Sequence, residues 1–211
     1  MAPAFCVRPF IKTPKEGIQC PKFYTYACCR NAIFDEDTEN KLVGICNAIV
    51  PDNVISPSQH KMLARQDIAY AITMCSSTPL LESNLSLLLG VLFEKQDSSW
   101  SKPKSYYPDG NYALFRNDQN EIEVVSDAAA SRTIWYFHDE TLFLASTSQR
   151  AIILFLGEFQ FDERVIPWML STGSLGPQLS WDKRLKRLPP DSSVLLDKKT
   201  GSTRKRVGRI P

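Results

Sequence analysis

Residues 110–146 read GNYALFRNDQNEIEVVSDAAASRTIWYFHDETLFLAS. Four runs of apolar and aromatic residues, each of strand length, alternate there with turns that contain Asn and Asp. Runs of this kind joined by short turns are typical of neighbouring antiparallel strands. We therefore predict a β-meander with strands at Asn111–Arg116, Glu121–Ser126, Thr133–Phe137 and Thr141–Ser146.

The chain after the meander predicts two short helices and a last strand. Ser148–Phe155 and Glu163–Ser171 are segments of helix length, and Ser193–Leu196 is an apolar segment of strand length. Helices packed on an antiparallel sheet make an α+β protein. The fold class expected from the residues alone is therefore α+β.

The sequence before the meander predicts a hairpin followed by two helices. The runs Lys22–Cys29 and Lys41–Val50 flank an acidic turn, which favours paired strands. Ser58–Thr73 has apolar residues at roughly helical spacing after a Ser-Pro start. Leu80–Gln96 carries a stripe of leucines at helical spacing. The polar segment Asp97–Pro108 is then expected to be a surface loop.

Length and composition favour a single domain with no membrane span. The chain has 211 residues, 43% of them hydrophobic, which suffices for one sizeable core. No run approaches the roughly 18 apolar residues that cross a bilayer, and the start lacks the pattern of a signal peptide. We expect a soluble, cytoplasmic protein, in which the six cysteines stay reduced.

Metal coordination is not predicted. The sequence has no Cys-x2-Cys pair, and its two histidines, His60 and His138, lie far apart.

Charge is distributed unevenly along the chain. The net charge is +2, yet Trp181–Pro211 holds ten Lys or Arg against three Asp, so this end is +7 and the remainder is −5. A basic end can bind nucleic acid through phosphate contacts, but a solvated rim is the more common structure. We favour the solvated rim.

Several segments follow one another in the order and at the separations of a known family's motifs. They are Asp109–Phe115 for Asp-Gly-x-Phe-Ala, Ser126-Asp127 for Arg-Asp, Thr133–Tyr136 for Pro-Leu-Tyr-Tyr, Leu142–Ser146 for Leu-Phe-Ala-Ser, Phe161–Glu163 for Leu-Asp-Glu, and Leu185–Pro190 for Ile-x-x-Leu-Pro-Pro-Gly before the strand Val194–Asp197. Together they resemble the glutaminase-type domain of the asparagine synthetase family. The resemblance is clearest over residues 43–201.

The resemblance implies a particular α+β fold. This is the four-layer αββα sandwich of N-terminal nucleophile (Ntn) hydrolases, with two antiparallel sheets face to face and helices outside each. It also implies one glutamine amidotransferase-like domain over residues 1–201. The basic tail that comes next, residues 202–211, is expected to be flexible.

An active member of the family would need a cysteine at its mature N-terminus. That thiol attacks the glutamine amide, and its own α-amino group acts as the base. Position 2 is Ala2, and the nearest cysteine, Cys6, becomes N-terminal only if residues 1–5 are removed. Cys6 is therefore the candidate catalytic residue for an active amidotransferase.

The residues that would grip glutamine are only partly retained. The family's Asn-Gly-Glu-Ile-Tyr-Asn motif leaves Gly44 and Asn47 as candidate substrate-binding residues. Residues 75–78, Cys-Ser-Ser-Thr, contain no Asp for the substrate's α-amino group, and Ala130 replaces the Gly of Arg-Asp-x-x-Gly. The resemblance therefore favours a degenerate domain, a pseudoenzyme.

Asp109 and Asp127 remain from the family's motifs. We interpret them as turn and strand-end residues that support the fold rather than as an acid–base pair.

The leading hypothesis is a non-catalytic module of an ATP-dependent amide-forming synthetase, as the related lasso-peptide cyclases also lack the nucleophilic cysteine. No cofactor is expected in this chain, because ATP and magnesium belong to the partner synthetase, supplied in trans or as a missing C-terminal half. The docking candidates are Trp168, Trp181 and the basic tail.

Two other functions stay open. One is an active glutamine amidotransferase that uses Cys6 after processing. The other is nucleic-acid binding through residues 183–209. A homodimer is also left open, and no membrane partner is expected.

Overall fold

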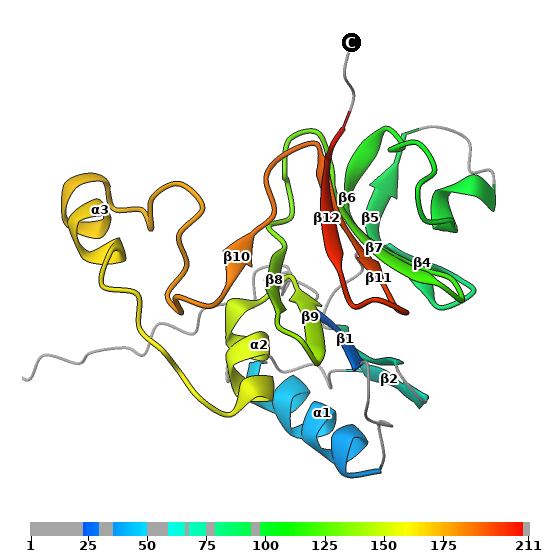
Figure 1. The fold of residues 1–211 in the computed structure, drawn as a ribbon, viewed down its shortest axis with the longest axis horizontal. Helices are drawn as coiled ribbons and strands as arrows, with labels where there is room; N and C mark the ends of the chain where they lie inside the picture. Colours follow the sequence, from blue (N-terminus) through cyan, green and yellow to red (C-terminus); the bar gives the residue numbers. More distant parts are fainter. Residues whose placement is uncertain are drawn as a thin grey trace, which may run out of the picture.

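A computed structural model describes the backbone of residues 23–29, 36–49, 59–65, 68–74, 79–93 and 98–208, and the side chains of residues 37–49, 79–93 and 99–208. Within these ranges, two antiparallel sheets of six strands each lie face to face (Figure 1). The molecule is thus an α+β protein, as the sequence predicts. None of its described helices is long and apolar enough to cross a membrane.

The first sheet takes strands from both ends of the chain. Its order is β10-β8-β9-β1-β3-β2. The strands are β1 (Phe23–Cys29), β2 (Gln59–Arg65), β3 (Ile68–Met74), β8 (Trp135–His138), β9 (Leu142–Ser146) and β10 (Lys186–Arg187). In this sheet β1 is a central strand, paired with β3 on one side and β9 on the other.

The second sheet has the order β12-β11-β7-β6-β5-β4. Its strands are β4 (Leu80–Ser83), β5 (Ser86–Leu92), β6 (Gly110–Asn117), β7 (Glu121–Ser126), β11 (Ser192–Asp197) and β12 (Thr203–Val207). The pairs β4–β5, β6–β7 and β11–β12 are joined by short turns, whereas residues 93–109 connect β5 to β6. The strands β7 and β11 are also neighbours, although they lie far apart in the sequence. Between these two strands, the chain crosses to the first sheet and returns.

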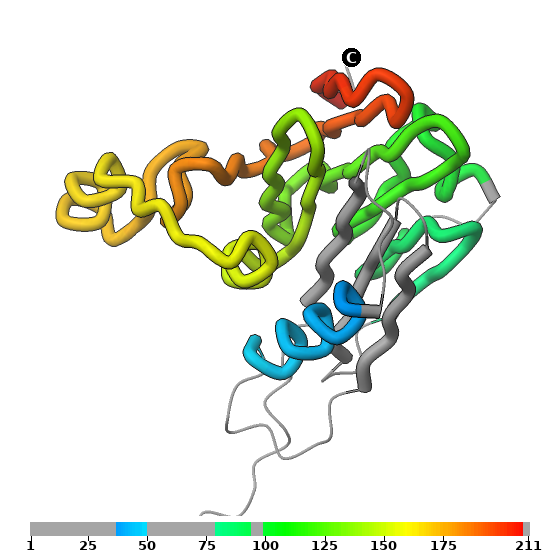
Figure 2. The backbone as a smooth tube through the Cα atoms, turned by 60° about the horizontal axis from the view of Figure 1, so that its bottom comes forward, coloured from blue at the N-terminus to red at the C-terminus, as the bar shows by residue number. Residues whose placement is uncertain are grey.

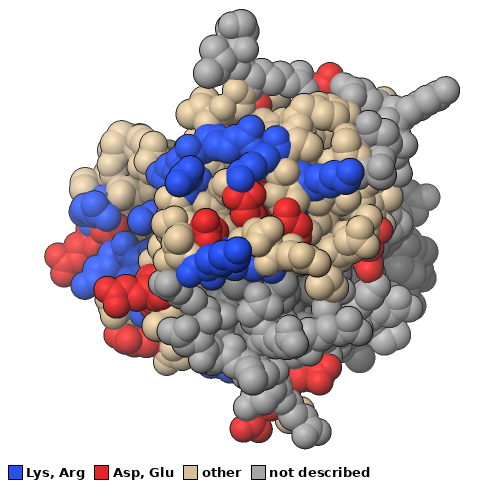
Figure 3. Space-filling view, turned by 45° about the vertical axis from the view of Figure 1, so that its right-hand side comes forward, with Lys and Arg blue, Asp and Glu red and all other residues tan. Residues whose placement is uncertain are grey.

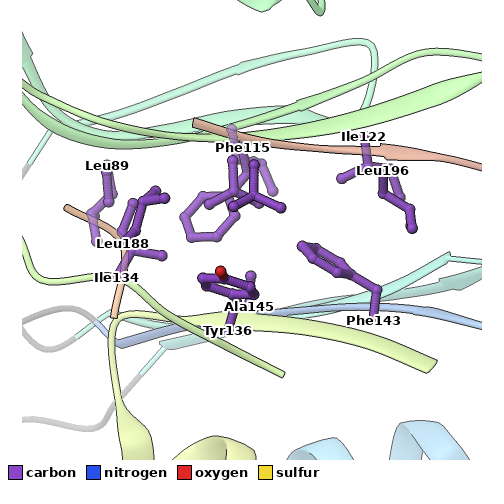
Figure 4. Close-up of a cluster of buried hydrophobic side chains, with 13 residues drawn as sticks. Leu89, Phe115, Ile122, Ile134, Tyr136, Phe143, Ala145, Leu188 and Leu196 are labelled. Atoms are coloured by element: carbon purple, nitrogen blue, oxygen red, sulfur yellow. The ribbon is translucent and has the colours of Figure 1, made fainter. Parts of the chain in front are cut away.

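The main core lies between the two sheets. Alternate residues of each strand point inward, as the pleat of a strand requires. Figure 4 shows side chains from both sheets meeting there, with Phe115 and Leu196 from one sheet opposite Tyr136 and Phe143 from the other. These residues are fully or almost fully buried, so the two sheets share one apolar layer.

Two helices cover the outer face of the first sheet. They are α1 (Glu36–Ile49) and α2 (Gln149–Leu156), whose apolar sides pack on Trp135, Phe137 and Leu144. Figure 2 shows α1 lying along this sheet, away from the second sheet. A third helix, α3 (Val165–Thr172), lies apart from both sheets (Figure 1).

The outer face of the second sheet has a different cover. A 3-10 helix, η1 (Ser98–Ser101), begins a segment that runs to residue 108. Trp100 and Tyr107 of this segment pack on Leu88, Tyr112 and Leu114. In the part of the chain that the structure describes, no α-helix lies over this face, so helices cover only one of the two sheets.

The predicted β-meander and the elements after it are confirmed. The strands β6, β7, β8 and β9, the helices α2 and α3, and the strand β11 lie within two residues of the predicted bounds.

The hairpin partner predicted at Lys41–Val50 is wrong, because residues 41–49 belong to α1 and residue 50 lies outside the described residues. Its buried residues, Leu42, Ile45, Cys46 and Ile49, recur at a helical period of three and four.

The helix predicted at Ser58–Thr73 is also wrong, since residues 59–65 form β2 and residues 68–73 lie in β3. Large residues recur at every second position of Ile68–Ala69–Tyr70–Ala71–Ile72, which is the period of a strand.

The helix predicted at Leu80–Gln96 is wrong, because residues 80–92 form a β-hairpin; residues 94–96 lie outside the described residues. A two-residue turn at Asn84 and Leu85 joins β4 to β5, and both residues have the positive φ angles of a tight hairpin turn. Leu87, Leu88 and Leu89 are all buried, because one face of β5 meets the main core and the other meets Trp100. A strand buried on both faces has no alternation, so its leucines mimic a helical stripe.

The predicted tail from residue 202 contains a strand. Residues 203–207 form β12, which pairs with β11 along its whole length. Residues 209–211 lie outside the described residues.

Candidate docking surface

Residues 157–185 leave the sandwich between α2 and β10, and we call this segment the excursion. Gly157 ends α2 in a left-handed conformation, φ 73°, with its N–H donating to the Ile153 carbonyl. This is a common helix stop, because glycine carries no Cβ to oppose that conformation. Figures 1 and 2 show the excursion, with α3 at its far end, standing away from the sheets.

The base of the excursion is closed by backbone pairing. Phe161 and Asp182 form an antiparallel bridge. The Asp162 N–H donates to the Trp181 carbonyl at 3.0 Å, and the Lys183 N–H donates to the Gln160 carbonyl at 2.9 Å. The outgoing and returning chains therefore hold each other where they leave the sandwich.

Asp162 fastens the outgoing chain. The Arg164 guanidinium donates two hydrogen bonds, of 2.8 and 2.7 Å, to its carboxylate and holds the pKa of that carboxyl below its usual value. The Asp162 backbone carbonyl accepts from the Val165 N–H at 3.1 Å. The residue therefore also anchors the first turn of α3.

Asp182 fastens the returning chain in the same way. Its carboxylate is completely buried and accepts from the Gln160 N–H at 2.9 Å and from Arg184 at 2.9 and 2.7 Å. Burial by itself would raise the pKa of Asp182, but these hydrogen bonds outweigh it and the pKa lies below its usual value. Two carboxylates thus fasten the base of the excursion through hydrogen bonds to backbone and arginine.

Aromatic side chains are exposed beside this base. The rings of Phe159 and Phe161 have centroids 6.2 Å apart, and those of Phe161 and Trp181 lie 6.4 Å apart in a stacked arrangement. All three side chains are exposed to solvent. Such an aromatic cluster is costly to leave in water and is typical of interaction surfaces.

Helix α3 is apolar on more than one side. Val165 is buried, while Ile166, Trp168 and Leu170 are exposed, with Leu170 at 84%. Gly173 ends the helix in a left-handed conformation, φ 69°. A surface helix normally keeps its apolar residues on one stripe, so α3 presents apolar surface that nothing in the described residues covers.

A groove of about 480 Å³ separates the excursion from the sandwich. Its lining combines two tryptophans, small loop residues and one arginine: Thr133, Trp135, Trp168, Ser174, Leu175, Gly176, Pro177, Leu179 and Arg187. At Gly176 a Cβ would lie 2.6 Å from the Trp168 ring, so only glycine permits this close approach. The indole is thereby held against the loop as a fixed wall.

Arg187 is the sole charged residue in the lining of this groove. It lies on β10, next to Trp135 in the strand register, and is exposed. Within the described residues its guanidinium makes no hydrogen bond or ion pair. Aromatic walls with one unpaired cation suit an apolar side chain that lies next to a carboxylate.

The sequence-predicted substrate residues lie elsewhere. Gly44 and Asn47 are one turn apart on the exposed side of α1, over the outer face of the first sheet. They do not line the groove. Cys6 and residues 75–78 lie outside the described residues. Among the described residues, no cluster of His, Cys, Asp or Glu could hold a metal ion.

Asp127 has the structural role that its position in the sequence predicts. Its carboxylate accepts from the backbone N–H groups of Tyr112, Ala129 and Ser131, at 2.8, 2.9 and 3.1 Å. Its carbonyl accepts from the Asp191 N–H at 2.9 Å. Asp127 thus shapes the two crossings between the sheets, at residues 127–134 and 188–191.

Sequence reasoning identified two exposed residues of the candidate docking surface and missed others. Trp168 and Trp181 are exposed as expected. Phe159, Leu170 and Arg187 were not identified. The apolar run of residues 165–170, VIPWML, could have indicated the surface, because it exceeds what one buried helix face needs.

A comparison of the sequence with models of known protein families, and with curated proteins, finds no match.

Proposed function

We propose that this chain is a glutaminase-type domain of the asparagine synthetase family that lacks amidotransferase activity and docks onto an ATP-dependent amide-forming synthetase. The groove between Trp168 of the excursion and Arg187 of the sandwich is the observation that carries the proposal.

Backbone conformation supports the family. Ala130 stands where the family's Arg-Asp-x-x-Gly motif has glycine, and Asp191 stands at the glycine of its Leu-Pro-Pro-Gly motif. Both residues have left-handed backbones, with φ of 48° and 47°. This conformation favours glycine, so the chain keeps the shape that the motifs require even where the glycines are gone.

The arrangement of sheets and helices supports the comparison with an Ntn-hydrolase sandwich. Two antiparallel sheets lie face to face, and α1 and α2 form an outer layer. On the second sheet the segment 98–108 takes the place of the helices that a fourth layer would contain. Two sheets with one helical layer fit a domain that has kept the arrangement of its sheets and lost its catalytic residues.

The described residues also favour loss of activity. Gly44 and Asn47 lie on the exposed face of a helix and line none of the described grooves. Ser126, at the arginine position of the Arg-Asp motif, is buried, and its hydroxyl has no hydrogen-bond partner. A buried serine cannot supply the positive charge of an arginine at that place.

The groove supports docking rather than catalysis. It offers tryptophan walls and a cation, and it has no nucleophile with a neighbouring base in its lining. In protein interfaces, Trp and Arg at the centre of a patch commonly contribute about 2 kcal/mol or more each. In this proposal ATP and magnesium are bound by the partner synthetase.

The proposal is tested by binding and by activity. Isothermal titration calorimetry measures the affinity for an amide-forming synthetase domain from the same genome that has no glutaminase half. Trp168→Ala and Arg187→Ala should each weaken binding by about thirtyfold, corresponding to about 2 kcal/mol. Phe93→Ala is the matched control, since Phe93 is also an exposed aromatic residue but lies next to the end of β5, far from the groove. Equal affinity of all variants would overturn the docking site.

Activity is measured as glutamate released from glutamine by the purified chain, together with its intact mass. No release is expected. Turnover by a form that starts at Cys6 would overturn the loss of activity and support the amidotransferase instead.

A further inference from the structure

Strand β12 forms one edge of the second sheet and pairs with no further strand among the described residues. It is the last strand in that sheet, and its partner is β11. A free edge presents a row of backbone N–H and C=O groups that can pair with another extended chain.

The register shows which groups face outward. The N–H of Asp197 donates to the Ser202 carbonyl, and the N–H of Gly208 donates to the Asp191 carbonyl. Hydrogen-bonded and non-hydrogen-bonded pairs alternate along an antiparallel ladder. Residues 204 and 206 therefore bond to β11, whereas the backbone groups of Thr203, Lys205 and Val207 point to the free edge.

This edge is strongly basic. Arg204, Lys205 and Arg206 are consecutive, and Lys and Arg side chains form a stripe on this side of the molecule (Figure 3). Arg206 is fixed by Glu123 at 3.0 Å. Lys205 is exposed and makes no ion pair within the described ranges. Two such edges would repel each other, so the charges oppose pairing with a second copy and favour an acidic chain.

A small pocket lies beside the edge. It has a volume of about 200 Å³ and is lined by Ser105, Tyr106, Tyr107, Arg206, Val207 and Gly208. Tyr106 is exposed, and Val207 is 78% exposed. In strand addition, backbone hydrogen bonds supply affinity, and pockets for alternate side chains supply specificity. The β12 edge supplies the backbone groups, and the neighbouring pocket can hold one side chain of the added strand.

We propose that β12 takes up an acidic, extended segment of the synthetase partner as an additional antiparallel strand, with an apolar side chain of that segment in the Tyr106 pocket. This inference rests on the proposed function, because it names how that partner is recognised. It differs from nucleic-acid binding, which would use the same cations but neither the outward N–H groups nor the pocket.

The test uses a fluorescein-labelled Glu-Val-Glu-Val-Glu-Val-Glu peptide and fluorescence anisotropy. The acidic peptide should bind at least about tenfold more tightly than the same peptide with Lys in place of Glu. Two further peptides carry N-methyl groups on either the odd or the even residues. Since only alternate residues face β12, one of these peptides should lose at least about tenfold in affinity and the other should bind almost normally.

Variants of one residue separate charge from the backbone. Lys205→Gln removes the charge and should weaken binding about threefold. Lys205→Pro also removes the outward N–H and should weaken it at least about tenfold. Proline fits there without breaking the β11 ladder, because residue 205 donates no bond to β11. Unchanged circular dichroism of both variants verifies the fold.

Equal binding of the two N-methylated peptides would overturn strand addition. So would displacement of the peptide by oligothymidine at comparable affinity, if Lys205→Pro also weakened peptide binding no more than Lys205→Gln. The synthetase titration is scored separately. If the synthetase docks through Trp168 but the peptide does not bind, only the strand-addition inference is wrong. If the peptide binds but the synthetase does not dock, the proposed function is wrong and the β12 edge remains a peptide-binding site.

Discussion

The two outer faces of the sandwich are covered by opposite means. On the first sheet, α1 and α2 pack through apolar side chains such as Leu42 and Ile152. On the second sheet, a segment without an α-helix, residues 98–108, is held by a buried ion pair between Arg116 and Glu123 as well as by Trp100 and Tyr107.

The buried pair is fully bonded. Both side chains are completely inaccessible to solvent, and they lie 3.0 Å apart. Arg116 donates to the carbonyls of Trp100 and Tyr106, each at 2.7 Å. Glu123 accepts from the Lys104 N–H and the Ser193 hydroxyl, each at 2.8 Å, and from Arg206. Arg116 thus satisfies backbone carbonyls that a helix would have satisfied internally.

This contrast shows how a short loop can replace a helical layer. A helix can cover a sheet with apolar side chains alone, because its backbone groups bond to one another. An irregular segment needs partners for its backbone, and here Arg116 and Glu123 bond to the backbone of four of its residues. The helices on the first sheet should therefore tolerate apolar substitutions of similar volume. The segment 98–108 on the second sheet should instead be strongly destabilised when one charge of the buried ion pair is removed.

The largest expected effect is at Glu123. Glu123→Ala leaves Arg116 buried without its counter-charge, and the free energy of unfolding should fall by about 3–5 kcal/mol. Urea denaturation followed by circular dichroism measures the change. Glu121→Ala, two residues away on β7, removes only the more exposed pair with Lys104 and should cost less than about 1 kcal/mol. Similar losses for both variants would contradict the contrast between the two covers.

The helical cover should respond to a cavity instead. Leu42→Ala removes a completely buried side chain under α1, and the expected cost is about 2–5 kcal/mol. The same denaturation experiment applies, with Glu39→Ala on the exposed side of α1 as the control. Leu42→Met keeps the volume and should cost less than about 1.5 kcal/mol. A cost for Leu42→Met as large as for Leu42→Ala would show that this face is not a tolerant apolar layer.

The excursion is held by a third kind of interaction, an ionised carboxylate, whose contribution to stability depends on pH. Asp182 has a lowered pKa in the folded protein. The ionised carboxylate therefore stabilises the fold fully at pH values above the pKa of an unfolded aspartate, which is about 3.9. This stabilisation is lost as the pH falls through the lower pKa that Asp182 has in the folded protein. Asp182→Asn should cost about 1.5–3 kcal/mol at pH 7 and much less near pH 2. Urea unfolding of both forms at both pH values, followed by the intrinsic fluorescence of the tryptophans, measures this cost. An equal cost at both pH values would contradict the role of the ionised carboxylate.

The smallest effect is expected at Gly44. Gly44→Ala should stabilise the protein by about 0.8–1 kcal/mol, since a Cβ there meets open space on an exposed helix. Gly157→Ala is the opposite case, because its left-handed backbone penalises any Cβ, and it should destabilise by about 1–2 kcal/mol. Thermal unfolding distinguishes them. A destabilising Gly44→Ala would mean that this glycine is needed for contacts that an exposed helix does not make.

Patterns between sequence neighbours predict the C-terminal half well. Alternation, Asn and Asp turns and apolar spacing indicate the meander and α2, because hairpins and short helices form from local contacts. The same patterns fail at Leu80–Leu92, where β5 is buried on both faces. Burial on a second face depends on Trp100, and no local period records that contact.

The candidate docking surface was predictable only in part. Trp168 and Trp181 are expected from the sequence to be exposed, and both are exposed. Arg187 could not be found in this way, because only the return of the chain through β10 places it opposite Trp168.

The α+β class, the meander and the exposed tryptophans can be predicted from the sequence, since each depends on composition or on neighbouring residues. The cover of the second sheet, a loop around a buried ion network, and the basic free edge of β12 emerge only from tertiary contacts. Glu123 and Arg206 are 83 residues apart in the chain yet 3.0 Å apart in the fold. Contacts of that separation arise from strand order, which no local pattern encodes.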